Sequence, residues 1–245
     1  MPALELFSSH AFQPLRRFGF EHPFWSLNAD TIIHTWIVIG IISLLIIACR
    51  IALRYPHSIG HYAITSYVTS WRDLYQQTVG VFSFGPFSFV ISLFTYIFLC
   101  NLSALIPWFE EPTSDLNTTL ALGLSAFAYT QGCSIAAHGL AGYIRHYFEP
   151  IALLMPLNVV GELASIVSIS FRLFGNIFGG MVISKLLLGA ISGSLIAELI
   201  ALITGINLVM ALFFGLFESL IQAFVFAMLT LTSLSLALYS DDQKG

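Results

Sequence analysis

The chain has very few charged residues. Only 9% of its 245 residues are Asp, Glu, Lys or Arg, against about 25% in soluble proteins. Hydrophobic residues make up 57%, and the mean hydropathy is +0.87. This composition excludes an ordinary soluble domain and indicates a polytopic membrane protein. The net charge of −4 is too small to indicate a partner, and the chain has no basic run that would suggest nucleic acid.

Cysteine and enzyme motifs are also scarce. Cys49, Cys100 and Cys133 lie apart in apolar stretches, and an odd, unclustered set supports neither a disulfide framework nor a metal site. The chain contains no Gly-x-Ser-x-Gly, no His-Glu-x-x-His and no Walker loop. We therefore expect no catalytic residue, no cofactor and no metal in this chain.

Long apolar runs dominate what is present. Residues 1–30 form a polar, aromatic segment, and the first span is expected at 31–53. Arg16 and Arg17 precede that span, so a signal-anchor remains an alternative, although no Ala-x-Ala-like site follows. Residues 59–81 mix aromatic, charged and aliphatic side chains, which favours an amphipathic helix at the membrane interface.

The rest of the chain predicts four further crossings. Residues 87–141 read as a helical hairpin, with spans at 87–108 and 116–140. Residues 156–239 hold two apolar stretches, 156–188 and 196–239, each too long for one perpendicular crossing. Steep tilts, or bends near Gly205 or Gly215, would accommodate the excess. The prediction is an all-α membrane protein with about five transmembrane helices, and the absence of an internal repeat disfavours an inverted-repeat transporter.

Charges in the loops suggest the orientation. Arg50, Arg54 and Arg72 follow the first span, and Arg145 follows the third. By the positive-inside rule these loops are cytoplasmic, although the two N-terminal arginines oppose that assignment. The segment 108–115 is acidic, as expected outside. We therefore expect the N-terminus outside and the C-terminus in the cytoplasm.

One fixed charge interrupts the stretch 156–188, and this charge is Arg172. At about 100° per residue, small and polar side chains fall on the same helix face. They are Ser165, Ser168, Arg172, Gly175, Asn176 and Gly179. An arginine at mid-membrane costs about 2.5–3.5 kcal/mol on insertion scales, so it normally faces protein or water and marks a pathway. A guanidinium stays charged, so Arg172 can be a barrier or a counter-ion but not a proton carrier.

Arg172 and Glu162 also have a purely structural interpretation, in which they pair to fix helix packing. Ten residues apart on one helix, they lie about 15 Å apart along the axis, so direct pairing is disfavoured. Glu162 could line the exit side of an ion path or be solvated at the interface. Asn176, one turn from Arg172, could hydrogen-bond the guanidinium or make a polar contact between helices.

A second polar stripe lies on the last helix. Glu218 and Gln222 are four residues apart, and Gly215, Ala211 and Asn207 extend the stripe. A carboxylate at membrane depth is costly when ionised, which makes Glu218 a proton-relay candidate; solvation near a surface is the alternative. Asp115 and Asn117 sit at the expected outer mouth, where capping competes with a role in ion entry.

Three sequence blocks resemble the a subunit of F-type ATP synthase. The first is Arg172-Leu-Phe-Gly-Asn176 with Gly179-Gly180 after it and Glu162 before it. The second is Gln222-Ala-Phe-Val-Phe-Ala-Met-Leu-Thr, and the third is Pro112-Thr-Ser-Asp-Leu-Asn-Thr-Thr-Leu-Ala-Leu. The resemblance runs from about Phe24 to the C-terminus.

This resemblance implies a mechanism. The chain would be non-catalytic by itself and would sit in a lipid membrane beside a ring of c subunits, with b-type peripheral stalk subunits and the remaining synthase subunits as partners. Two aqueous half-channels would reach the ring carboxylates, separated by Arg172. Ions would move along Arg172, Asn176, Gln222, Glu218 and Glu162. The outer half-channel would include Asp115, Asn117 and Asn207, and Ser165, Ser168, Gly175 and Gly179 would contact the ring.

The resemblance leaves the coupling ion, the ring size and the working direction open. It implies a bacterial inner membrane or an organellar energy-coupling membrane. The chain departs from the family at Met181 and Gly215, where relatives often have glutamate or histidine, and at Ser165-Ile166, which replaces a basic-proline pair. Our hypothesis is that Glu218 takes over the acidic role. The competing classes are a self-contained transporter or channel in which Arg172 binds an anion, and a structural scaffold.

Overall fold

The fold is almost entirely helical. The computed structural model describes residues 11–12, 27–106, 111–148, 155–191 and 205–239, so most of the predicted polar segment 1–30 lies outside the described residues. Two-residue strands β1 (Ala11–Phe12) and β2 (Leu27–Asn28) pair antiparallel. Among the described residues, five helices are long and apolar enough to cross a membrane: Thr31–Ala52, Phe84–Leu102, Leu116–Tyr143, Met155–Leu187 and Leu212–Leu238. The predicted all-α membrane protein with five spans is confirmed.

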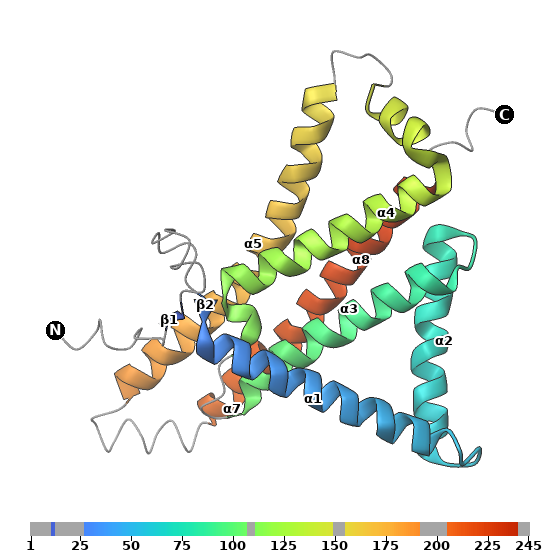
Figure 1. Cartoon of the computed structure of the whole chain (residues 1–245). Helices are drawn as coiled ribbons and strands as arrows, with labels where there is room; N and C mark the ends of the chain where they lie inside the picture. Colours follow the sequence, from blue (N-terminus) through green and yellow to red (C-terminus); the bar gives the residue numbers. More distant parts are fainter. Residues whose placement is uncertain (1–10, 13–26, 107–110, 149–154, 192–204, 240–245) are drawn as a thin grey trace.

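The first three helices follow one another around the sides of a triangle (Figure 1). Helix α1 (Ala29–Ala52) is apolar all round and exposes almost all its large side chains. Among its side chains that the structure describes, Val38 is the one buried hydrophobic residue. A helix with so little protein around it is suited to contact with lipid. It packs sparingly on α2 and α3.

Helix α2 (Ile59–Val79) has clear end signals. The Ser58 side chain accepts a hydrogen bond from the Gly60 amide at 3.3 Å, which caps the first turn. Gly80 adopts a φ of 79°, and its N–H donates to the Gln76 carbonyl at 2.9 Å, which ends the helix. The expected element 59–81 therefore stops two residues early. One face buries Trp71 and Tyr75, while the rest of the helix is largely exposed.

Helix α3 (Phe84–Leu102) leads through the short turns η4 (Ser103–Leu105) and η5 (Pro112–Ser114) to α4 (Leu116–Phe148). Asp115 caps α4: its Oδ1 accepts from the Asn117 amide at 2.9 Å, and its carbonyl from the Thr119 amide at 3.2 Å. The expected end of this span at 140 falls next to a break in α4 at Gly139. Gly139 has non-helical angles (φ 72°, ψ 166°), and the chain resumes helical structure beyond it.

The last two apolar stretches form α5 (Met155–Ile191), α7 (Ile206–Met210), the π-helical segment η7 (Ala211–Glu218) and α8 (Ser219–Tyr239). The expected turn after 188 and the start of the last stretch at 196 fall largely on 192–204, outside the described residues. Gly205 has a φ of 63°, and Gly215 lies inside η7. The backbone is therefore irregular at both places where the sequence predicts a bend.

Helix α8 occupies the centre of the bundle and packs on α3, α4 and α2 (Figure 1). Ala223 and Ala227 are fully buried, and such small residues let neighbouring helices approach closely. Trp71 of α2 stacks obliquely on Phe94 of α3 with ring centroids 4.7 Å apart. Ser235 Oγ donates to the Thr78 carbonyl at 2.8 Å, so α2 is held to α8.

Candidate functional site

Helix α5 has one face that is buried against the rest of the chain and another face that is exposed. Ile166, Ser170, Leu173 and Ile177 are buried, and α5 packs most extensively on α4. The other face is exposed at Ser165, Ser168, Arg172 and Gly175. Built Cβ atoms at Gly175 and Gly179 would meet nothing within 4 Å. The small and polar face is therefore uncovered in the single chain, with Asn176 half-buried at its edge.

Arg172 has no acidic partner among the described residues. The Glu162 carboxylate instead accepts a hydrogen bond from Gln131 Nε2 of α4 at 3.1 Å. The packing interpretation, in which Glu162 and Arg172 pair on one helix, does not match this arrangement. The exposed guanidinium is left available to a group outside this chain.

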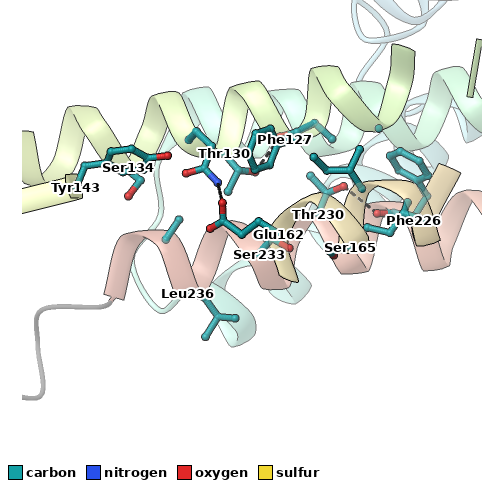
Figure 2. A pocket seen from close by; sticks show the side chains of 16 residues that line it. Phe127, Thr130, Ser134, Tyr143, Glu162, Ser165, Phe226, Thr230, Ser233 and Leu236 are labelled. Atoms are coloured by element: carbon teal, nitrogen blue, oxygen red, sulfur yellow. Dashed lines mark hydrogen bonds between the residues drawn. The ribbon is translucent and has the colours of Figure 1, made fainter. Parts of the chain in front are cut away.

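A cavity of about 300 Å³ lies between α4, α5 and α8. Figure 2 shows Glu162 at its wall, joined by the dashed hydrogen bond to the Gln131 amide. Its polar lining consists of Thr130, Gln131, Ser134, Tyr143, Glu162, Ser165, Thr230 and Ser233. Phe127, Phe226 and Leu236 are among the apolar residues of the wall. The lining comes from α4 between Gly123 and Tyr143, from α5 between Glu162 and Ile169, and from α8 between Phe226 and Ala237. The ends at Tyr143 and Ala237 are on the side that the sequence predicts to be cytoplasmic.

A second cavity, of about 410 Å³, opens at the other end of α4. Its lining is formed by Thr31, Ile32, Thr35, Trp36, Tyr96, Asp115, Asn117, Thr118, Ala121 and Leu122. The residues come from α1, α3 and the first turns of α4. Asp115 and Asn117 thus line a cavity while Asp115 also caps α4, so their two sequence interpretations are compatible.

Glu218 and Gln222 lie at the junction of η7 and α8. Gln222 is buried and Glu218 is half-buried. The regular spacing assumed for a stripe through Gly215, Ala211 and Asn207 does not hold, because residues 211–218 form a π-helix with wider turns. The Asn207 side chain lies outside what the structure describes.

Glycines bring the elements around η7 into close contact. A Cβ on Gly180 of α5 would lie 2.8 Å from Phe214 Cδ1, and one on Gly215 would lie 2.5 Å from Leu105 Cδ2. Real Cβ atoms do not approach other atoms that closely. η7 is therefore packed directly against α5 on one side and against η4 on the other.

Glu111 is a site residue that the sequence reasoning missed. It precedes Pro112 at the start of η5 and is half-buried. Burial, and then the neighbouring Glu218 carboxyl, raise the pKa of Glu111 from its ordinary 4.5 to about 8. In the sequence it is one of several acids in a presumed outer turn, where a solvated role is the ordinary expectation. The Glu-Pro pair at the start of a short turn was the only available signal.

Comparisons with known proteins identify the same family over most of the chain. A family model described as ATP synthase A chain matches residues 32–235. ATP synthase subunit a of Moorella thermoacetica is 34% identical over 204 residues, covering 83% of this chain and 88% of the relative. The subunit a of Desulforamulus reducens is 34% identical over 221 residues, covering 86% and 79%. ATP synthase subunit a 2 of Acaryochloris marina is 31% identical over 224 residues, covering 90% and 89%.

Proposed function

Because this chain belongs to the ATP synthase A chain family, we propose that it conducts protons to and from a ring of carboxylate-bearing c subunits in an F-type ATP synthase. It is a multi-pass membrane protein. Its partners in the proposal are the c-ring, the b-type peripheral stalk, the other synthase subunits and the lipid bilayer. We place it in a bacterial inner membrane with its N-terminus outside and its C-terminus in the cytoplasm.

The observation that carries the proposal is the uncovered face of α5. Arg172 is exposed and has no acidic partner among the residues that the structure describes. It stands among residues small enough for another helix to approach, namely Ser165, Ser168, Gly175 and Gly179. A charge at membrane depth requires a partner or water. A ring carboxylate passing this face would supply the negative partner, and the ring helices would cover the small residues.

Arg172 would then act electrostatically. Its positive charge favours the ionised form of the approaching ring carboxylate, which promotes release of the proton. The same charge repels a proton moving directly between the two cavities. Asn176, one turn away, would hold the guanidinium or a water on the same face. A proton moving down a membrane potential releases about 2.3 kcal/mol per 100 mV, so several protons must be coupled to each ATP.

The inner half-channel in this proposal is the cavity between α4, α5 and α8. Glu162 receives the departing proton there, and the hydroxyl groups along the wall provide sites for water. Gln131 holds the carboxylate at 3.1 Å and fixes its position. The cavity lies beside Ser165, on the first half of α5, before Arg172 in the chain.

The outer half-channel begins at the cavity lined by Asp115 and Asn117. Glu218 and Gln222 lie further along the route toward the ring, and Asn207 on α7 is assigned to the same route. Along α4 the outer cavity is lined by residues from Asn117 to Leu122 and the inner one by residues from Gly123 to Tyr143, so the two cavities follow one another along this helix. A proton can pass from one to the other only by riding on the ring.

The decisive experiment is ATP-driven proton pumping in membranes carrying the Arg172→Ala variant of the complete synthase. Passive proton leak through the membrane sector is measured in the same membranes. Lys185→Ala is the matched control, because Lys185 is an exposed cation on the opposite face of α5. We expect Arg172→Ala to abolish pumping with the complex assembled, and Lys185→Ala to pump normally.

Unchanged pumping in Arg172→Ala would reduce the arginine to a packing role and overturn the proposal. Anion transport by the isolated chain in liposomes would instead favour the self-contained transporter. Because the three relatives described above are named as synthase subunits, that alternative ranks second.

A further inference from the structure

The turn that carries Glu111 is inserted into the outer end of the bundle. Residues of η5 contact α1, α3, α4 and α5, and η4 contacts η7. The Glu111 carbonyl accepts from the Ser114 amide at 3.0 Å and from Ser114 Oγ at 2.8 Å, and Pro112 fixes the backbone between them. The backbone at Glu111 is therefore held in one place rather than swinging freely over the surface.

The charge of Glu218 of η7 acts on Glu111, and the charge of Glu111 acts on Cys100 of α3. The packing of η4 on η7 and of η5 on α3 brings these segments together. Two carboxyl groups that approach each other in a poorly hydrated site do not both ionise easily. One of them therefore holds a proton near neutral pH, in line with the pKa of about 8 at Glu111. A carboxyl that titrates near the working pH can both take up and give up protons.

A buried polar pair lies against the same turn. Thr113 Oγ1 donates to Asn101 Oδ1 at 2.6 Å, and both side chains are buried. Among the described residues, Asn101 Nδ2 has no hydrogen-bond partner. An unmet amide donor at 1% exposure normally hydrogen-bonds a buried water. This observation is independent of the two carboxyls and indicates that water reaches the space between α3 and η5.

Around η7, few side chains other than Glu111 and Glu218 can carry a proton. Gly215 has no side chain, and the space above it is filled by Leu105, whose Cγ would lie 3.0 Å from an added Cβ. Met181 carries no proton. Of the described acids, Glu111 and Glu218 are the pair whose charges interact across this junction.

We propose that Glu111 is the proton-loading residue of the outer half-channel and that it works in series with Glu218. The proposal rests on the proposed function. The Glu111 carboxyl gives its proton to the Glu218 carboxylate, directly or through water, and regains a proton from the outer aqueous phase. Glu218 passes its proton to a ring carboxylate and returns to its ionised form. No electron is transferred, and each O–H bond that breaks is replaced by one that forms.

The test measures ATP synthesis by the complete complex in membrane vesicles, per assembled complex, with an imposed potential and a varied outer pH. For Glu111→Gln we expect a loss of about tenfold or more, since a positioned proton-transfer group contributes at least that much. Glu111→Asp keeps a carboxyl and should retain synthesis within about fivefold of wild type. The double variant Glu111→Gln/Glu218→Gln should be within about twofold of Glu218→Gln alone, because two steps in series are not additive.

Asp73→Asn is the matched control, because Asp73 is an exposed acid on α2. Synthesis by Glu111→Gln at the wild-type rate would overturn the proposal, and so would equal losses in Glu111→Gln and Glu111→Asp, which would indicate packing. Arg172→Ala in the same series separates the two proposals. If Arg172→Ala uncouples the complex while Glu111→Gln does not, the half-channel function stands and only the loading role fails.

Discussion

Replacing Gly123 with alanine should separate α4 from α5 and disturb the position of Arg172. A Cβ on Gly123 would overlap Ser170 Oγ and would lie 3.3 Å from Ile166 Cγ2 and 3.5 Å from the Ile166 carbonyl oxygen. Ser170 is fully buried and cannot move its hydroxyl into open space. The methyl group therefore has to push α5 outward, and Arg172 is only two residues beyond Ser170.

The overlap allows the loss of stability in Gly123→Ala to be estimated. Adding a methyl group to a close-packed contact typically costs about 1–3 kcal/mol. For a chain of this size the corresponding fall in melting temperature is about 2–4 °C per kcal/mol. The rate of proton pumping should be more sensitive to this displacement than the stability is, because displacing a reacting group by about 1 Å can reduce a rate about a hundredfold. We expect a loss of pumping of about tenfold in Gly123→Ala.

Ser170→Ala provides the compensating change. Its hydroxyl has no hydrogen-bond partner among the described residues, and a buried, unsatisfied polar group costs about 1–3 kcal/mol. Removing it should be neutral or stabilising by itself. In Gly123→Ala/Ser170→Ala the alanine methyl occupies the space that the hydroxyl leaves. We therefore expect the double variant to regain most of the stability and pumping.

The assay is a double-mutant cycle on the complete complex. Pumping is measured in membranes, and thermal loss of soluble chain is followed in the detergent-solubilised complex. The double variant should be more stable than the sum of the two single changes by about 0.5–3 kcal/mol, as for residues in direct contact. The reasoning is refuted if Gly123→Ala behaves like wild type, or if Ser170→Ala fails to relieve it.

Three further predictions concern other parts of the site. Thr113→Val removes the donor to Asn101 and should lower stability by about 1–3 kcal/mol, measured as a lower melting temperature of the solubilised complex; an unchanged value would contradict the buried pair. Gly175→Leu should leave the fold of the chain intact, because the site is open, yet prevent stable co-purification with the ring; normal co-purification would exclude Gly175 from the contact. Glu162→Gln should slow proton release during pumping about tenfold or more while assembly is normal, and a normal rate would remove it from the exit path.

The helices could be predicted because their signals are local. Apolar runs of sufficient length give the five spans, and Ser58 and Asp115 mark helix starts by their capping side chains. The polar face around Arg172 also followed from helical spacing alone. The exposure of that face in the structure agrees with the spacing, because α5 is regular in this part.

The other features of the site could not be predicted, because they depend on contacts between residues that are far apart in the sequence. Counting at a regular helical spacing fails in η7, since a π-helix changes which side chains share a face. The hydrogen bond between Gln131 and Glu162 joins residues 31 positions apart. The role proposed for Glu111 depends on η5 folding into the bundle against α1, α3, α4 and α5. A loop acid has no periodic pattern from which its burial could be inferred.

The uncovered face of α5 has a consequence for how the enzyme is built. In the proposed function, a newly inserted copy that has not yet met a ring presents Arg172 to lipid, where the guanidinium must draw in water or bend toward a headgroup. In such a copy the charged Arg172 is unfavourably placed in the membrane. The water that it draws in could also let protons leak across the bilayer. Biogenesis should therefore favour a finished ring before this chain is added, and orphaned copies should be short-lived substrates for membrane proteases. Arg172, which couples the ring to the two half-channels in the proposed function, would then also mark copies of this chain that lack a ring.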